Sequence, residues 1–173
     1  MSNDEHLKYP VGRFVPAENY SSEEIRKCIE TIESLPDKLE SVIKNITDKE
    51  LSTPYRDGGW TVRQVIHHMA DSHMNAFIRL KWTLTEETPT IKAYDEKAWA
   101  VTDETALDPV ISINFLKALH IKWVALLKLL KAEELKKSFL HPETGKHVSL
   151  ERQIATYAWH CDHHLAHIKL VVK

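Results

Sequence analysis

Four histidines crowd the C-terminal part of the chain, in the run WHCDHHLAH from Trp159 to His167. If this run is helical, His160 and His164 stand one turn apart and their rings can converge on one point. Neutral imidazole is the commonest protein ligand for zinc, nickel and iron. The pair therefore predicts half of a metal site.

The missing ligand must come from another segment. His167 is seven residues from His160, which corresponds to about 10 Å along a helix axis. Imidazoles that far apart on one helix rarely reach the same ion. We interpret His163 and His167 as hydrogen-bonded residues or pocket lining. An earlier run, HHMADSH, contains the adjacent histidines His67 and His68. A helix that carries this run and packs on the C-terminal one would complete a site of three ligands.

The other histidines favour blander interpretations. His73 and His120 fall on apolar stripes, which is typical of buried, hydrogen-bonded core residues, although His73 could also line the site. His6, His141 and His147 fall in an arm or in loops, so we expect them to be solvated.

The two cysteines do not point to chemistry. Cys161 adjoins His160, but its helical phase groups it with apolar residues, which predicts a core thiol. Cys28 lies on an apolar seam and is also expected in the core. The cysteines show no framework spacing, which fits a reducing environment and predicts a cytoplasmic protein.

Capping signals mark the first two helices that must position these residues. Ser21 or Ser22 caps the first, with Glu24 completing a capping box, and apolar residues then recur every seven positions. Pro36 lies inside this pattern and should kink or interrupt the helix. Thr61 with Gln64 opens the second helix in the same way.

The second half of the chain predicts two more helices. The second helix should end near Thr85, and residues 91–107 look like a long, partly ordered connection. Asp108-Pro109 then opens a third helix. Ser149 starts a fourth, which runs to about Val172. We therefore expect an all-α fold, a four-helix bundle with a long crossover between helices two and three.

Length and composition agree with one globular domain. The 173 residues suit a single domain, 1–173, in which residues 1–20 form an irregular N-terminal arm. The net charge of -2, without a basic block, argues against nucleic acid as a partner. No apolar run approaches the length of a membrane span, and the N-terminus does not read as a signal peptide, so no membrane partner is expected.

These motifs in this order resemble a known family. The segment GWTVRQVIHHMAD from Gly59 to Asp71, followed by the late pair His160 and His164, resembles the DinB/YfiT-like metalloenzyme superfamily, and the YfiT branch in particular. The resemblance covers nearly the whole chain. Each motif alone is weak, but their order and separation are fairly specific.

The resemblance implies a four-helix bundle that binds one divalent ion, zinc or nickel first, through one histidine of helix two and two of the last helix. The last two are His160 and His164. The family histidine stands eight residues after the tryptophan, here Trp60, which selects His68; His67 stays as the alternative. Asp71 could orient the His68 ring. The resemblance also implies a homodimer.

The expected activity has two forms. Three neutral histidines leave an ion with open positions, which can activate a water or ionise a small thiol. The resemblance implies either a metal-dependent hydrolase or a bacillithiol-type thiol S-transferase acting on a small-molecule substrate, with no general base assigned. Arg63, Asp71 and Tyr157 are candidates to bind a polar thiol.

Two other functions stay open at this point. A non-catalytic, structural metal-binding protein would close the coordination sphere with a fourth ligand, such as His67, His73 or His163. A plain helical interaction module would bind no stoichiometric metal at all.

Overall fold

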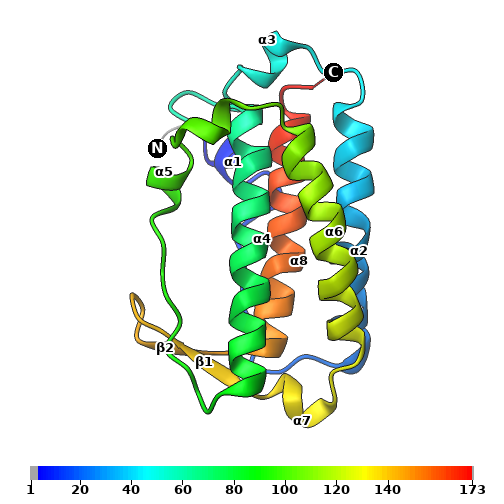
Figure 1. The fold of residues 1–173 in the computed structure, drawn as a ribbon, viewed down its shortest axis with the longest axis vertical. Helices are drawn as coiled ribbons and strands as arrows, with labels where there is room; N and C mark the ends of the chain where they lie inside the picture. The colour runs from blue at the N-terminus through cyan, green and yellow to red at the C-terminus, as the bar shows by residue number, and fades with distance from the viewer. Residues whose placement is uncertain (1–3, 173) are drawn as a thin grey trace.

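Four long helices form the body of the protein in a computed structural model that describes residues 4–172. They are α2 (Ser22–Ile43), α4 (Val62–Thr85), α6 (Val110–Lys128) and α8 (Leu150–Lys169). Figure 1 shows them side by side along the long axis of the molecule. The predicted all-α, four-helix bundle is confirmed.

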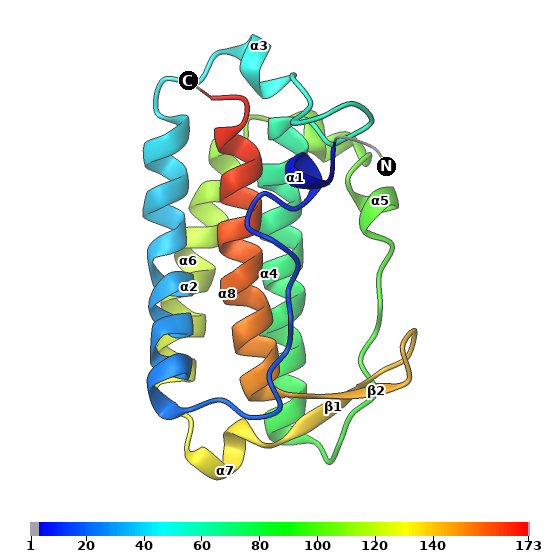
Figure 2. The ribbon, with the colours of Figure 1, turned by 180° about the vertical axis from the view of Figure 1, so that it is seen from behind.

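The order of the helices in the bundle depends on one long connection. After α4 the chain returns along the outside of the bundle through α5 (Glu96–Trp99) and the 3-10 turn η1 (Asp103–Ala106) (Figure 1). As a result α4 and α6 run in the same direction, and α2 and α8 run in the other (Figures 1 and 2). The beginning of α4 and the end of α8 therefore meet at the same end of the bundle.

Reciprocal caps begin both helices that the sequence marked most clearly. The Glu24 N–H donates to Ser21 Oγ at 3.2 Å, and the Glu24 carboxylate accepts the Ser21 N–H at 2.8 Å. Thr61 and Gln64 repeat the arrangement at 3.2 and 3.0 Å. Each cap satisfies backbone donors that the first turn of a helix leaves without partners. The second cap also fixes where α4 begins, and so the height of the histidines that follow.

Pro36 was expected to kink or interrupt its helix, and the structure shows that it does not interrupt it. The helix α2 continues from Ser22 to Ile43, with Pro36 buried inside it. A proline has no N–H, so the carbonyl four residues earlier loses its helical donor. That carbonyl belongs to Ile32, and His120 Nδ1 of α6 contacts it at 2.7 Å. A bond between helices therefore replaces the missing bond within α2.

The core lies between the four helices and is closed by large apolar side chains. Its largest fully buried members come from all four long helices: Ile32, Leu35, Leu39, Ile66, Met69, Leu80, Ile113, Leu116, Trp123, Leu150 and Ile154. Burial of such side chains contributes about 1.5–3 kcal/mol each. This packing is what holds α4 and α8 at a defined separation.

The helix α6 is more apolar than we expected. By length and composition it could cross a membrane, with a mean hydropathy of 1.5 in its most apolar window. The core helix of a soluble bundle passes the same test, and α6 packs against both α2 and α4. The feature is therefore weak evidence for a membrane span.

Several short elements were not predicted. They are α1 (Glu5–Lys8), α3 (Asp48–Leu51), α7 (Ala132–Leu135), and the antiparallel strands β1 (Ser138–His141) and β2 (Lys146–Ser149). The arm is thus not wholly irregular, because α1 lies within it. The hairpin was missed because its strands have four residues each and flank a polar turn, too short for a periodic pattern. Gly145 in that turn has a φ of 63°, a left-handed conformation that favours glycine.

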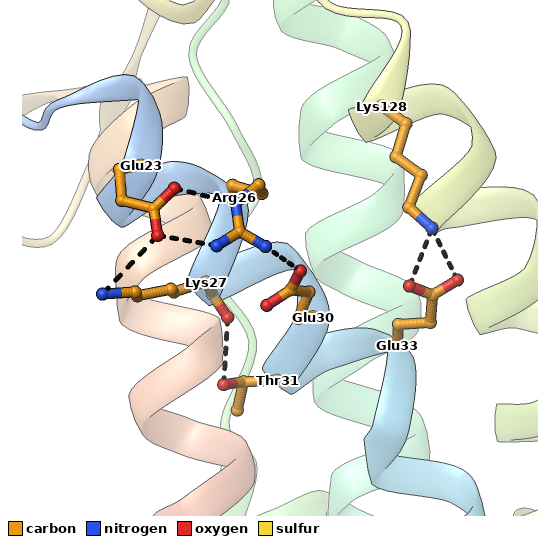
Figure 3. Close-up of polar contacts among 7 residues, drawn as sticks. All are labelled: Glu23, Arg26, Lys27, Glu30, Thr31, Glu33 and Lys128. Atoms are coloured by element: carbon orange, nitrogen blue, oxygen red, sulfur yellow. Dashed lines mark hydrogen bonds and ion pairs between the residues drawn. The ribbon is translucent and has the colours of Figure 1, made fainter.

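Exposed ion pairs lie along the first half of α2 (Figure 3). Arg26 binds Glu23 through two nitrogens at 2.6 and 2.8 Å and also pairs with Glu30 one turn later. Lys128 at the end of α6 contacts both carboxylate oxygens of Glu33 at 2.7 Å, which ties α6 to α2. Because these groups are exposed, solvent and salt screen each pair, and its contribution to stability is small.

Candidate metal centre

Three of the histidines singled out from the sequence meet inside the bundle. His68 lies in the second turn of α4, and His160 and His164 lie in the second half of α8. One ring nitrogen from each falls within 4.8 Å of the other two. Nε2 of His68 is 3.3 Å from Nε2 of His160. The structure thus brings together two segments about ninety residues apart in the sequence.

The distance between the two nitrogens suits shared coordination. Nitrogen ligands lie about 2.0–2.1 Å from zinc, so two of them at a tetrahedral angle are about 3.4 Å apart. The 3.3 Å between His68 and His160 matches that spacing. The donor set therefore fits a divalent ion of the kind that prefers imidazole.

Burial keeps these rings neutral. Burial lowers the pKa of His68 to about 4, and it lowers the pKa values of His160 and His164 well below the usual value. Charge on neighbouring histidines lowers the last two further. Near pH 7 each ring therefore keeps a lone pair that can bind a metal.

The structure separates His68 from its neighbour His67. Nδ1 of His67 contacts Ser112 Oγ at 2.7 Å, and its Nε2 faces the carbonyl of Leu107 at 3.3 Å. His67 is thus turned toward α6 and the crossover. The ring of His68 instead faces α8, with Trp60 packed on it at a centroid distance of 4.6 Å. Of the two alternatives that the sequence left open, only His68 joins the cluster.

Two histidines interpreted as core residues extend the cluster. His73 is buried, as predicted, but its Nε2 lies 3.1 Å from Nδ1 of His160. Its Nδ1 lies 2.8 Å from Nε2 of His120. Sequence reasoning missed this connection. The available signal was the five-residue spacing of His68 and His73, which places both on one helix at different heights, so that both can contact His160. Nothing in the sequence identified His120 as the partner of His73.

A second histidine group lies on the outer side of α8. His163, His164 and His167 also place one ring nitrogen each within 4.8 Å of one another. Nδ1 of His167 is 3.4 Å from Nδ1 of His164, and its Nε2 is 3.3 Å from the carbonyl of Lys8. Nδ1 of His163 is buried without a hydrogen-bond partner. The two groups share His164.

The N-terminal arm covers this outer group. It runs along α8 (Figure 2), where the Trp159 Nε1–H donates to the carbonyl of Gly12 at 3.0 Å. Phe14 packs near the same tryptophan, at a centroid distance of 6.1 Å. Tyr9 lies 5.9 Å from the ring of His163. The arm thus shields the outer group from solvent.

The residues suggested for other roles, Asp71, Arg63 and Tyr157, differ in the contacts that they make. Within residues 4–172 no hydrogen bond joins Asp71 to His68, so the expected orienting contact is absent; burial and the nearby Glu104 raise the pKa of Asp71 to about 6. Arg63 is engaged by the carbonyl of Leu107 and by Asp48. The Tyr157 hydroxyl donates to the carbonyl of Ser72 at 3.0 Å.

The two cysteines and His141, the last residue of β1, were also given expected environments from the sequence. Cys161 is a core residue as predicted, and burial raises the pKa of its thiol well above the usual value. Cys28 is half-buried at the edge of the core. The expectation that His141 is solvated is wrong, because its Nδ1 is buried and burial lowers its pKa.

Comparison with known proteins places the chain in a family. The DinB superfamily profile matches residues 31–168. A Bacillus subtilis (strain 168) protein named "Putative metal-dependent hydrolase YfiT" is 49% identical over 164 residues, which cover 94% of this chain and 92% of that one. A Bacillus cereus (strain 03BB102) relative, named a metal-dependent hydrolase in the same terms, is 49% identical over 162 residues, covering 94% of this chain and 93% of its own.

Solved structures agree. The structure of Bacillus subtilis YfiT, described as "a probable metal-dependent hydrolase with an unusual four-helix bundle topology", superimposes with a TM-score of 0.92 at 48% identity and covers 95% of this chain and 94% of its own. The four-helix bundle protein TT2238 shares the fold alone, with a TM-score of 0.57 at 19% identity, covering 84% of this chain and 98% of its own. By sequence and by fold, this chain belongs to the DinB superfamily, in its YfiT-like branch.

Proposed function

We propose that this protein is a metal-dependent enzyme whose single divalent ion, zinc or nickel, is bound by His68, His160 and His164. The observation that carries the proposal is the convergence of three neutral histidines from two helices on one point, with His68 and His164 buried and His160 half-buried. Relatives of this chain carry the name "Putative metal-dependent hydrolase".

The donor set favours catalysis over a purely structural ion. Structural zinc sites are closed by four protein ligands, whereas catalytic sites keep an open position. In the part of the chain that the structure describes, the cluster around His68 contains three donors. Two of the suggested fourth ligands are engaged elsewhere, His67 with Ser112 and His73 with His120. The third, His163, does not belong to the cluster around His68.

The proposed reaction is hydrolysis of a small-molecule substrate, and thiol transfer is the alternative. An ion held by three neutral imidazoles keeps its full charge, and so it supplies a water activated near neutral pH or, equally, an ionised thiol. The protein's part is to hold the three rings in place and to keep bulk solvent away from them. The name that the relatives carry favours water as the nucleophile.

The test is to load the protein with zinc and, separately, with nickel, and to offer two substrate sets. Simple esters and amides are assayed without any thiol, and an electrophile is assayed with a bacillithiol-type thiol. We expect turnover of the first set and its loss in His164→Ala. The control is His147→Ala, because His147 is an exposed histidine in β2.

The outcomes separate the candidate functions. Conjugation that requires thiol, without ester or amide turnover, would replace the hydrolase with the transferase. Stoichiometric metal without either activity would favour the non-catalytic alternative. No stoichiometric metal in protein purified without a His-tag would contradict the proposal altogether.

A further inference from the structure

The backbone carbonyl of Ile32 in α2 accepts no hydrogen bond from within its own helix. Because Pro36 lacks an N–H, the carbonyl of Ile32 is free to bind another group. His120 Nδ1 reaches it at 2.7 Å, in a buried part of the interface between α2 and α6. A carbonyl oxygen can only accept a hydrogen bond, so His120 must carry its proton on Nδ1.

This one acceptor determines the protonation of the next two rings. A neutral His120 with its proton on Nδ1 has its lone pair on Nε2, which accepts from His73 Nδ1–H at 2.8 Å. His73 then has its lone pair on Nε2, which accepts from His160 Nδ1–H at 3.1 Å. The lone pair of His160 is left on Nε2, the atom 3.3 Å from His68 Nε2.

We propose that His73 and His120 are positioning residues, which with the Ile32 carbonyl form a relay that holds His160 with the Nε2 lone pair directed at the metal site. The inference rests on the proposed function, because it assigns the relay to metal binding. In known metal sites, the second ring nitrogen of a ligand histidine usually donates to a carboxylate, carbonyl or water. Here two further histidines stand between the ligand and the carbonyl.

The surroundings of the relay leave it little freedom. His73 is fully buried and His120 is 3% exposed. The edge of Trp123 packs against both rings at centroid distances of 5.6 Å, and Tyr157 packs against His73 at 5.4 Å. Buried polar rings cost free energy unless each nitrogen has a partner. Every ring nitrogen of His73 and His120 has a hydrogen-bond partner. The bonds all run in one sense, because each ring donates from Nδ1 and accepts at Nε2.

The other α8 ligand has a shorter relay of the same kind. The carbonyl of Lys8 accepts from His167 Nε2–H at 3.3 Å, so the lone pair of His167 is on Nδ1. That lone pair faces Nδ1 of His164 at 3.4 Å, which leaves Nε2 of His164 for the ion. The longer contacts make this second relay the weaker one.

The first test uses the metal-free protein. Long-range proton–nitrogen NMR spectra report which nitrogen of a histidine carries the proton. We expect His160, His73 and His120 to be neutral and protonated on Nδ1 at pH 7. A proton on Nε2 of His160 in the wild-type protein would overturn the relay, whatever the metal affinity.

The second test measures zinc affinity by competition with a chelator. We expect His73→Phe to weaken binding 10–100-fold, as the loss of an outer partner of a ligand does in other metal sites. His120→Phe should have a smaller effect in the same direction and should leave His160 with a mixture of tautomers. His147→Phe, at an exposed site in β2, is the matched control. Affinities within twofold of wild type in both relay variants would contradict the proposal.

A milder variant covers the case in which a buried substitution prevents folding. Pro36→Ala returns an N–H to α2 that competes for the Ile32 carbonyl. We expect the His120 Nδ1–H resonance to shift and its exchange with solvent to quicken; an unchanged resonance would argue against this end of the relay. The two proposals fail separately: absence of metal binding removes the proposed function, while wrong tautomers with intact metal binding remove only the relay.

Discussion

The two histidine groups on α8 have the same residue type, similar burial and one shared member, yet they differ in what their nitrogens face. The inner group draws His68 from α4 and His160 and His164 from α8. The outer group takes His163, His164 and His167 from α8 alone. In the inner group two Nε2 atoms face each other at the spacing of shared ligands.

In the outer group a hydrogen bond already occupies the space between two of the rings. The nitrogens of His164 and His167 that approach each other share one proton, and the arm's Lys8 carbonyl takes the next one. An ion there would have to displace that bond and compete with the inner site for His164. The comparison teaches that ligand spacing defines a metal site only when the lone pairs also converge.

The largest expected effect breaks the inner group alone. His160→Ala removes a proposed ligand that the outer group does not contain, so we expect zinc affinity to fall more than about 100-fold, beyond the range seen for outer partners. Isothermal titration or chelator competition measures it. If His160→Ala kept wild-type affinity, the outer group would be the site.

The next effect concerns the stability of the metal-free protein as a function of pH. The pKa of His68 is about 4 in the folded protein and about 6.5 when unfolded, so the unfolded chain binds more protons as pH falls below 6.5. Between pH 7 and pH 5 this one group should lower the free energy of unfolding by on the order of 2 kcal/mol. Urea unfolding at the two pH values measures the sum over the buried histidines.

Variants of Asp71 and His163 test the sign of this pH dependence of stability. The pKa of Asp71 is raised to about 6, so this carboxyl has the opposite effect and stabilises the fold as pH falls below 6. Asp71→Asn should therefore steepen the loss of stability between pH 7 and pH 5. His163 also has a pKa of about 4, so His163→Gln should make the loss shallower. Stability that rises toward pH 5 would contradict the burial of these rings.

A smaller effect tests His167, the outer-group residue that contacts the shared His164. The ring of Tyr55 stacks on His167 at a centroid distance of 3.9 Å. His167→Phe keeps a ring for this stacking but removes the partner of His164 Nδ1. We expect zinc affinity to fall up to about tenfold, at the low end for an outer partner, because the contact is long. Equal affinity in His167→Phe and wild type would show that His164 needs no such partner.

The smallest expected effect comes from the outer group's own member. His163 contributes no hydrogen bond through Nδ1, and its ring stacks on Trp159 at 4.4 Å. We expect His163→Gln to change zinc affinity less than twofold, with the binding stoichiometry still one ion per chain. A loss comparable to that of His160→Ala would mean that the outer group binds the ion.

Much of this arrangement could be predicted from local sequence. The Ser21 and Thr61 caps mark where helices begin because their partners lie three residues away, and the four-residue spacing of His160 and His164 follows from helical geometry. The choice of a core position for Cys161 rests on the same periodicity. The short hairpin and α1 escaped prediction because four residues carry too little pattern.

Long-range partners were decided by the tertiary structure alone. A sequence does not say whether His67 or His68 faces α8, because neighbouring positions on a helix differ by about 100° and the answer depends on how α4 rotates against the bundle. Nor does it show that the proline in α2 frees a carbonyl for His120 of α6. The sequence by itself determined which residues can bind a metal and on which helices they stand. Only the packing of four helices decided which lone pairs meet, because hydrogen bonds and metal coordination depend on distances of about 3 Å between distant segments.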